Sequence, residues 1–112
     1  MKEKDQRYLL NILNDLFYLL KITQNVRQKQ LQKNPMLLDS ILFRFVQISE
    51  NISRLSPEIK SNHPSIPWQQ MIGMRNRIVH DYGQVDITVV YDTVTRDVPN
   101  LYHQILEIKV SS

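Results

Sequence analysis

The chain has 112 residues, of which 42% are hydrophobic and none is cysteine, and its formal net charge is +3 at pH 7. We expect this length to form one domain, residues 1–112, around one hydrophobic core, and the absence of cysteine excludes a disulfide framework, a cysteine nucleophile and a thiolate metal site. No apolar run approaches the ~20 residues of a membrane span and no signal peptide is recognisable, so the chain is expected to be cytoplasmic. Its mild excess of basic residues is compatible with binding to nucleic acid.

The N-terminal third predicts one long amphipathic helix followed by a polar segment. Leucine and isoleucine recur at three- and four-residue steps over residues 9–20, which is the spacing of a helix with one buried face. Asp5 is placed to begin this helix. Residues 23–34 are polar and basic, which indicates a short helix or an exposed turn.

A second long helix is expected in the middle of the chain. Pro35 suits its first turn, its apolar face covers residues 38–55, and Pro57 ends it. Residues 56–66 contain prolines, serine and asparagine, which predict a loop.

Two further helices are expected after this loop. One runs from Pro67 to Gly83, and the other begins at an Asp86 cap and buries an apolar seam that extends to Ile108. Pro99 lies inside that seam and should kink the helix or remove one of its hydrogen bonds. The pattern predicts an all-α, up-and-down antiparallel bundle of four main helices plus a short extra helix.

The helix expected over residues 67–82 carries an unusual set of side chains. Placed at ~100° per residue, Arg75 falls within the apolar side, whereas Asn76 and His80 follow Gly73 along the opposite flank. An arginine in an apolar stripe is costly unless it is paired, and glycine in a helix often marks a close backbone approach. Clusters of such exceptions tend to be functional sites.

Each residue also has a purely structural interpretation. Arg75 can pair with a carboxylate such as Glu50 or Asp15, and His80 can cap the carbonyls at the end of its helix. Tyr82 can be an ordinary core residue with its hydroxyl at the rim. The residue types and their spacing leave these alternatives open.

The stretch RNRIVHDY, residues 75–82, resembles the Arg-x4-His-x-Tyr signature of the HEPN superfamily in its HepT-like branch. The likeness extends over nearly the whole chain and includes the blocks RLSPE, HPSIPW, IGMRN and VYDTV. This branch contains toxin ribonucleases that are encoded beside a small nucleotidyltransferase antitoxin. The resemblance therefore implies the HEPN fold, a homodimer, and metal-independent cleavage of RNA, with tRNA as a leading substrate.

The resemblance also implies roles for individual residues. Arg75 and His80 from two subunits would line one catalytic cleft, with Asn76 as the polar residue that follows the arginine. Tyr82 would be the site where the partner nucleotidyltransferase attaches AMP and silences the toxin. No cofactor and no metal are expected.

Elementary chemistry fits this implied reaction. A ribose 2′-hydroxyl supplies the nucleophile, so the protein needs a group that moves a proton near neutral pH, as histidine does, and a permanent cation that matches phosphate, as arginine does. Arg77, Lys29 and Lys33 can hold the RNA backbone, although a solvated face explains them equally well. The competing hypothesis is a catalytically silent helical dimer that binds a nucleotidyltransferase partner or RNA.

Overall fold

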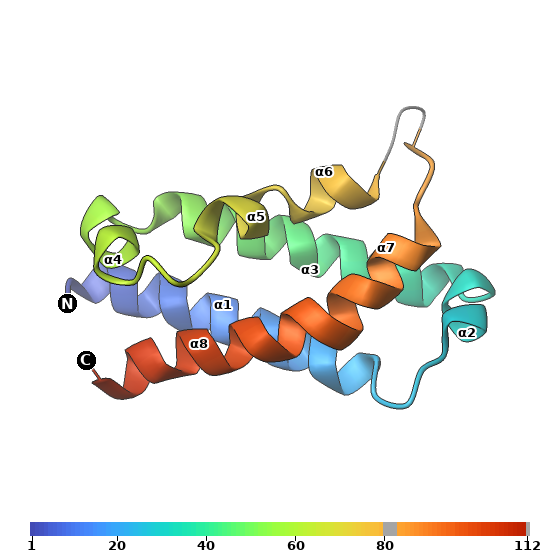
Figure 1. Ribbon diagram of the computed structural model, residues 1–112, viewed down its shortest axis with the longest axis horizontal. Coiled ribbons are helices and arrows are strands. Elements are labelled where there is room, and N and C mark those ends of the chain that lie inside the picture. The colour runs from blue at the N-terminus through green and yellow to red at the C-terminus, as the bar shows by residue number, and fades with distance from the viewer. Residues whose placement is uncertain (80–82, 112) are drawn as a thin grey trace.

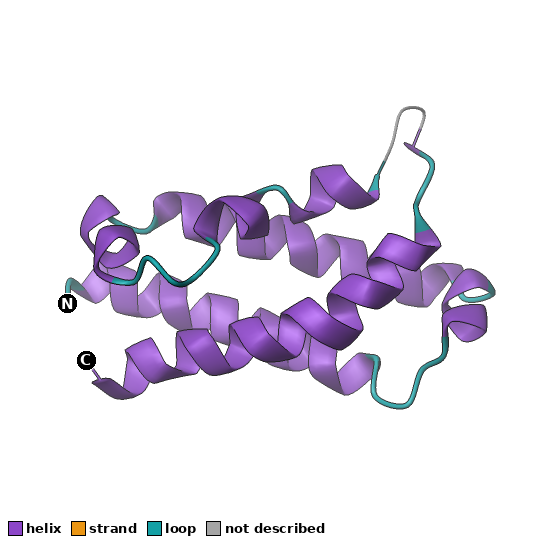
Figure 2. Cartoon of the chain, in the orientation of Figure 1, coloured by secondary structure: helices purple, strands orange, loops and turns teal. Residues whose placement is uncertain are grey.

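The computed structural model describes residues 1–79 and 83–111, and within them the chain is all-α, as predicted (Figure 2). The helical elements, in chain order, are α1 (Glu3–Ile22), α2 (Gln28–Gln32), α3 (Pro35–Arg54), α4 (Pro57–Asn62), α5 (Trp68–Ile72), α6 (Met74–Ile78), α7 (Ile87–Asp92), the π-helical η2 (Thr93–Asp97) and α8 (Val98–Ser111). None of the helices in this described part of the chain is both long and apolar enough to cross a membrane.

Three long helical elements form the body of the bundle. α1 packs against both α3 and α8, and α5 and α6 form a broken fourth arm against α3 (Figure 1). The chain termini lie at one end, and α2 lies at the other end beside the start of α7. The polar segment after α1 thus forms a short helix, which was one of the two predicted outcomes.

The core is built from the apolar stripes that the sequence displays. The fully buried side chains on α1 and α3 are Leu9, Ile12, Leu16, Leu19, Ile41, Phe45, Ile48 and Ile52. Burying each contributes ~1.5–3 kcal/mol relative to an exposed side chain. This burial fixes the rotation of α3 about its axis, so the face of α3 opposite the stripe is directed away from the core.

A polar seam joins α1 to α3 beside this core. Arg44 donates a hydrogen bond from Nη1 to Oδ1 of Asp15 at 2.8 Å, and its guanidinium lies 3.9 Å from the ring centroid of Tyr18. Burial raises the pKa of the Asp15 carboxyl, and the bond from Arg44 opposes that rise. Asp15 is therefore the partner of Arg44, and the alternative in which Asp15 pairs with Arg75 is wrong.

Asp5 ties the start of α1 to the start of α4. The first long helix begins at Glu3, so the prediction that Asp5 begins it is wrong. The Asp5 side chain is buried and accepts hydrogen bonds from the backbone N–H of Ser56 at 2.9 Å and from its hydroxyl at 2.6 Å. Burial alone would raise the pKa of Asp5, but these bonds and nearby lysines hold the pKa below its usual value.

Part of the predicted loop over residues 56–66 is helical. α4 begins at Pro57, which suits a first helical turn because it needs no N–H partner there. The indole N–H of Trp68 donates to the carbonyls of Lys60 and His63, at 3.2 and 3.0 Å. These bonds hold the end of α4 against the start of α5.

The C-terminal helix begins at the predicted cap, and its regular hydrogen bonding is interrupted before Pro99, as the sequence predicts. Asp86 caps it by accepting a hydrogen bond from the N–H of Val89 at 3.1 Å. Pro99 has no N–H and would clash with the preceding turn of a regular helix. The chain widens there into the π-turn η2, in which the N–H of Val98 bonds to the carbonyl of Thr93, five residues earlier.

Candidate active site

The helix predicted over residues 67–82 is interrupted at Gly73. α5 ends at Ile72, α6 begins at Met74, and Gly73 serves as the cap of both. A Cβ at Gly73 would lie 3.5 Å from the nearest atom, the carbonyl oxygen of Gln69, which is ordinary contact. The expected close backbone approach at Gly73 is therefore absent. The Ser49 hydroxyl instead reaches the carbonyl of Ile72 at 2.8 Å and fixes the break against α3.

α6 also ends earlier than predicted, at Ile78 and not at Gly83. Val79 is extended, with φ −100° and ψ 116°, and forms an antiparallel bridge with Val85. The N–H of Asp86 bonds to the carbonyl of Ile78 at 2.9 Å. β-Branched valine suits an extended conformation, and Gly83 has φ 76°, a left-handed conformation that glycine adopts without strain. Val79 and Val85 thus run antiparallel side by side, and we call these two paired flanks the chain reversal.

The sequence between these flanks holds two of the predicted site residues. His80 follows Val79 directly and Tyr82 comes two positions after His80, and both lie outside the described residues. Their predicted roles stay predictions. The bridge between Val79 and Val85 nevertheless brings together described residues on either side of the HDY stretch.

Arg75 and Asn76 lie side by side on the exposed surface of α6. Arg75 Nη1 is 3.5 Å from Asn76 Oδ1, at the limit of a hydrogen bond, and both residues are exposed. The expectation that Arg75 lies in a buried apolar stripe is therefore wrong. Over residues 1–79 and 83–111 the structure gives Arg75 no ion pair, so pairing with Glu50 is wrong as well. As far as the described residues go, the Arg75 guanidinium is available to bind an anion.

The Arg75 side chain borders a groove between α3 and the chain reversal. This groove has a volume of about 350 Å³ and is lined by Asp39, Leu42, Phe43, Val46, Arg75, Val79, Gly83 and Val85. Phe43 is 57% exposed and Val46 is 38% exposed, although both are large and apolar. We call Phe43 and Val46, with the groove beside them, the α3 face.

The sequence carries a signal for the α3 face that a search for charged motifs misses. The buried stripe of α3 runs through Ile41, Phe45 and Ile48, and Phe43 and Val46 fall between these positions. Apolar residues out of phase with a buried stripe must face either solvent or a partner. Their position beside Arg75 makes them part of the candidate site.

The three predicted RNA-backbone contacts divide between two places. Lys29 and Lys33 are exposed on and just after α2, beside Arg27, which gives this end of the bundle a basic surface. α2 contacts α7, and Gln28 donates to the Thr88 hydroxyl at 3.0 Å, so this surface lies at the same end as the chain reversal (Figure 1). Arg77, by contrast, points away from the α3 face and lines a cavity on the other flank of α6. Within the described ranges, no three His, Asp or Glu residues gather closely enough to hold a metal ion.

Comparison with known proteins gives one consistent result. The family model described as "Ribonuclease HepT-like" matches residues 12–108. A candidate RNase of Caldanaerobacter subterraneus subsp. tengcongensis is 27% identical over 101 residues, which cover 90% of each chain. A probable ribonuclease HepT of Thermococcus cleftensis is 27% identical over 90% of this chain and 92% of that protein. A candidate RNase of Methanocaldococcus jannaschii is 23% identical over 94% of this chain and 97% of its own. No solved structure matches.

Proposed function

This chain belongs to the HepT-like ribonuclease family, a family of RNA-cleaving enzymes, and from that membership we propose that it is a metal-independent endoribonuclease whose catalytic residues are Arg75, Asn76 and His80. The observation that carries the proposal is the state of Arg75. Its guanidinium is exposed, has no carboxylate partner among the described residues, and lies beside Asn76 at the edge of an open groove. A structural arginine would be expected to have a fixed partner.

The proposed reaction uses the RNA's own nucleophile. The ribose 2′-oxygen attacks the adjacent phosphorus, the bond from phosphorus to the 5′-oxygen breaks, and the products are a 2′,3′-cyclic phosphate and a 5′-hydroxyl. A base takes the proton of the 2′-hydroxyl and an acid returns one to the leaving 5′-oxygen, tasks suited to His80 because imidazole titrates near neutral pH. Arg75 stabilises the charge that develops on the phosphoryl oxygens, and Asn76 orients the phosphate. tRNA is the expected substrate class.

We propose that the active enzyme is a homodimer joined through the α3 face. The exposed Phe43 and Val46 support this assignment, because such side chains gain free energy when a second copy covers them. A two-fold axis beside α3 would bring the two Arg75 side chains, and the two HDY stretches, to a single cleft. RNA would then bind across both subunits.

Regulation is proposed to act at Tyr82, two residues after His80. A cognate minimal nucleotidyltransferase, acting as the antitoxin of a toxin–antitoxin pair, would attach AMP to the Tyr82 hydroxyl. The added phosphate brings negative charge and bulk into a site meant for RNA phosphate, so substrate would be repelled and sterically excluded. No protein cofactor is required for the cleavage step.

The test is RNA cleavage by purified protein in the presence of EDTA. tRNA and total RNA are incubated with the wild type, His80→Ala and Arg75→Ala, and the new ends are analysed chemically. We expect cleavage by the wild type alone, with cyclic phosphate and 5′-hydroxyl ends. Equal cleavage by the folded His80→Ala protein would refute the catalytic assignment, and 5′-phosphate ends would refute the 2′-hydroxyl mechanism.

Two variants serve as matched controls for this experiment. His63→Ala removes a histidine whose only described hydrogen bonds use its backbone. Arg54→Ala removes an exposed arginine of α3 that lies eleven positions beyond Phe43, about 16 Å along the helix at 1.5 Å per residue. Both should cleave like the wild type. The intact mass of each protein reports whether Tyr82 already carries AMP, which separates an inhibited enzyme from a silent one.

A further inference from the structure

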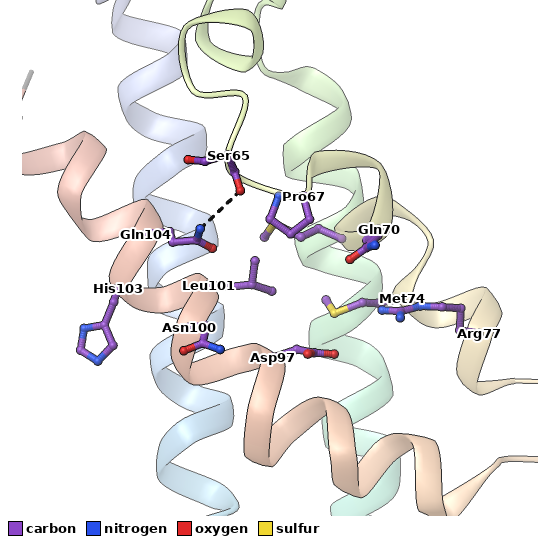
Figure 3. A pocket seen from close by; sticks show the side chains of 11 residues that line it. Ser65, Pro67, Gln70, Met74, Arg77, Asp97, Asn100, Leu101, His103 and Gln104 are labelled. Carbon is purple, nitrogen blue, oxygen red and sulfur yellow. Dashed lines mark hydrogen bonds between the residues drawn. The ribbon is translucent and has the colours of Figure 1, made fainter.

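A second cavity lies on the flank of α6 opposite the α3 face. It has a volume of about 480 Å³ and opens between α5 and α6 on one wall and η2 and α8 on the other (Figure 3). Arg77 lines it, two positions after Arg75 on the same short helix. The proposed active-site groove and this cavity therefore flank one helical turn from either side.

The floor of the cavity is apolar. Met71, Met74 and Leu101 line it, and Figure 3 shows Met74 and Leu101 directed into it. Methionine is flexible and polarisable and makes favourable contacts with aromatic rings. A volume of this size lies within the range of small-molecule sites and accommodates a nucleotide.

The rim of the cavity carries exposed polar groups. Asp97 projects from η2 toward the α6 wall, where Arg77 lies, and Asn100 lines the cavity from α8 (Figure 3). All three are exposed, and none of their side chains hydrogen-bonds or ion-pairs with another residue of the described ranges. Gln104 differs, since it donates to the carbonyl of Ser65 at 3.4 Å and closes the far end.

These groups match one nucleotide. A carboxylate accepts hydrogen bonds from the exocyclic amino group of a base, asparagine offers a donor and an acceptor to the same base edge, and arginine binds phosphate. Recognition of an extruded base by such polar groups, with apolar side chains against its faces, is the usual arrangement for single-stranded RNA. An apolar peptide would leave Asp97 and Arg77 desolvated without partners, which is costly.

We propose that this cavity binds one unpaired nucleotide of the RNA substrate, whose base carries an exocyclic amino group, at a position next to the cleaved bond. Asp97 accepts from the amino group, Asn100 bonds to the neighbouring atoms of the base edge, and Arg77 holds the phosphate that leads across α6 to Arg75. The cavity thus selects adenine, cytosine or guanine over uracil. This inference rests on the proposed ribonuclease function, because that function supplies the RNA.

The first test measures binding and does not require cleavage. The chain has four methionines, and methyl NMR resolves them: Met71 and Met74 line the cavity, whereas Met1 and Met36 are 46% and 81% exposed and serve as internal references. AMP, CMP, GMP and UMP are titrated separately. We expect the Met71 and Met74 signals to shift with at least one of the first three nucleotides, and UMP to bind about tenfold more weakly. Shifts spread over all four methionines, no shifts with any nucleotide, or equal binding of UMP would overturn the proposal.

The second test uses cleavage by folded variants. Asp97→Asn and Asn100→Ala are compared with Asn14→Ala, which removes an exposed asparagine from α1. We expect both cavity variants to lower kcat/KM about tenfold at cleavage sites flanked by an amino-bearing base. The kcat/KM at sites flanked only by uracil should be unchanged, and both variants should keep the wild-type melting temperature. Uniform loss at all sites, or no loss at any, contradicts base recognition.

The two tests separate the failure of this inference from that of the proposed function. Methionine shifts without any RNA cleavage would support the cavity and refute the ribonuclease mechanism. Cleavage with unchanged site preference in both cavity variants would support the ribonuclease and refute the cavity assignment.

Discussion

Truncation of Phe43 tests the proposed dimer face with a magnitude that follows from its exposure. The side chain is 57% exposed, and burying a whole phenylalanine is worth ~1.5–3 kcal/mol. Covering the exposed part therefore contributes about 1–2 kcal/mol per subunit. Because a two-fold interface uses each residue twice, Phe43→Ala should weaken the dimer by about 2–3.5 kcal/mol and raise its dissociation constant roughly 30- to 300-fold.

The assay is sedimentation velocity over a concentration series, with Phe17→Ala as the matched control. Phe17 is 53% exposed, nearly as much as Phe43, but it lies on α1, where its ring centroid is 6.1 Å from that of Tyr102. We expect Phe17→Ala to dimerise like the wild type. Both variants should keep the wild-type melting temperature within a few degrees. An unchanged dissociation constant for Phe43→Ala, or a larger effect of Phe17→Ala, would refute the assignment of the α3 face.

Three further predictions concern stability. Asp5→Ala leaves the buried Ser56 donors without an acceptor and should cost about 2–4 kcal/mol in the free energy of unfolding at pH 7. Because the pKa of Asp5 is lowered in the folded protein, this contribution is present above the ordinary pKa of 3.8 and is lost as pH falls through the folded value. In denaturant unfolding, the free energy of unfolding of the wild type should therefore fall more with decreasing pH than that of the variant. Gly73→Ala should be neutral or raise stability by up to ~1 kcal/mol, because φ is −86° and there is room for a Cβ; a large loss of melting temperature would contradict this. Arg44→Ala should destabilise the fold by ~1–3 kcal/mol, since it leaves the Asp15 carboxylate buried without a partner, and Arg44→Ala with Asp15→Ala together should cost less than the sum of the two singles.

Local signals in the sequence correctly predict the starts of α3 and α7. Pro35 begins α3, with Asn34 as the cap that accepts from Leu37, and Asp86 caps α7. Each of these signals involves atoms within about one helical turn, so the sequence displays both partners together. The same holds for Pro99, whose missing N–H leads directly to the π-turn before it.

The errors fall where residues distant in the chain decide the outcome. Asp5 appeared to be a helix start because its partner, Ser56, lies 51 positions away. The early end of α6 depends on the pairing of Val79 with Val85, which replaces helical hydrogen bonds with bonds across the chain reversal. A helical wheel assumes one unbroken helix, so it placed Arg75 on the apolar side when the break at Gly73 and the end at Ile78 leave it exposed.

If the proposed dimer forms through the α3 face, we expect dimer formation and RNA binding to strengthen each other. In the proposed dimer, a second copy covers Phe43 and Val46 and thereby removes water from the edge of the groove that holds Arg75. A guanidinium cannot lose its charge, so partial desolvation strengthens its attraction to an anion. The phosphate of RNA is such an anion. Because coupling between two binding equilibria is reciprocal, an RNA with 2′-deoxyribose at the cleaved position, which cannot react, should lower the dimer dissociation constant. Arg75→Ala should abolish this effect while leaving RNA-free dimerisation as tight as before or tighter. Equal tightening by RNA in the wild type and in Arg75→Ala would show that the two sites act independently.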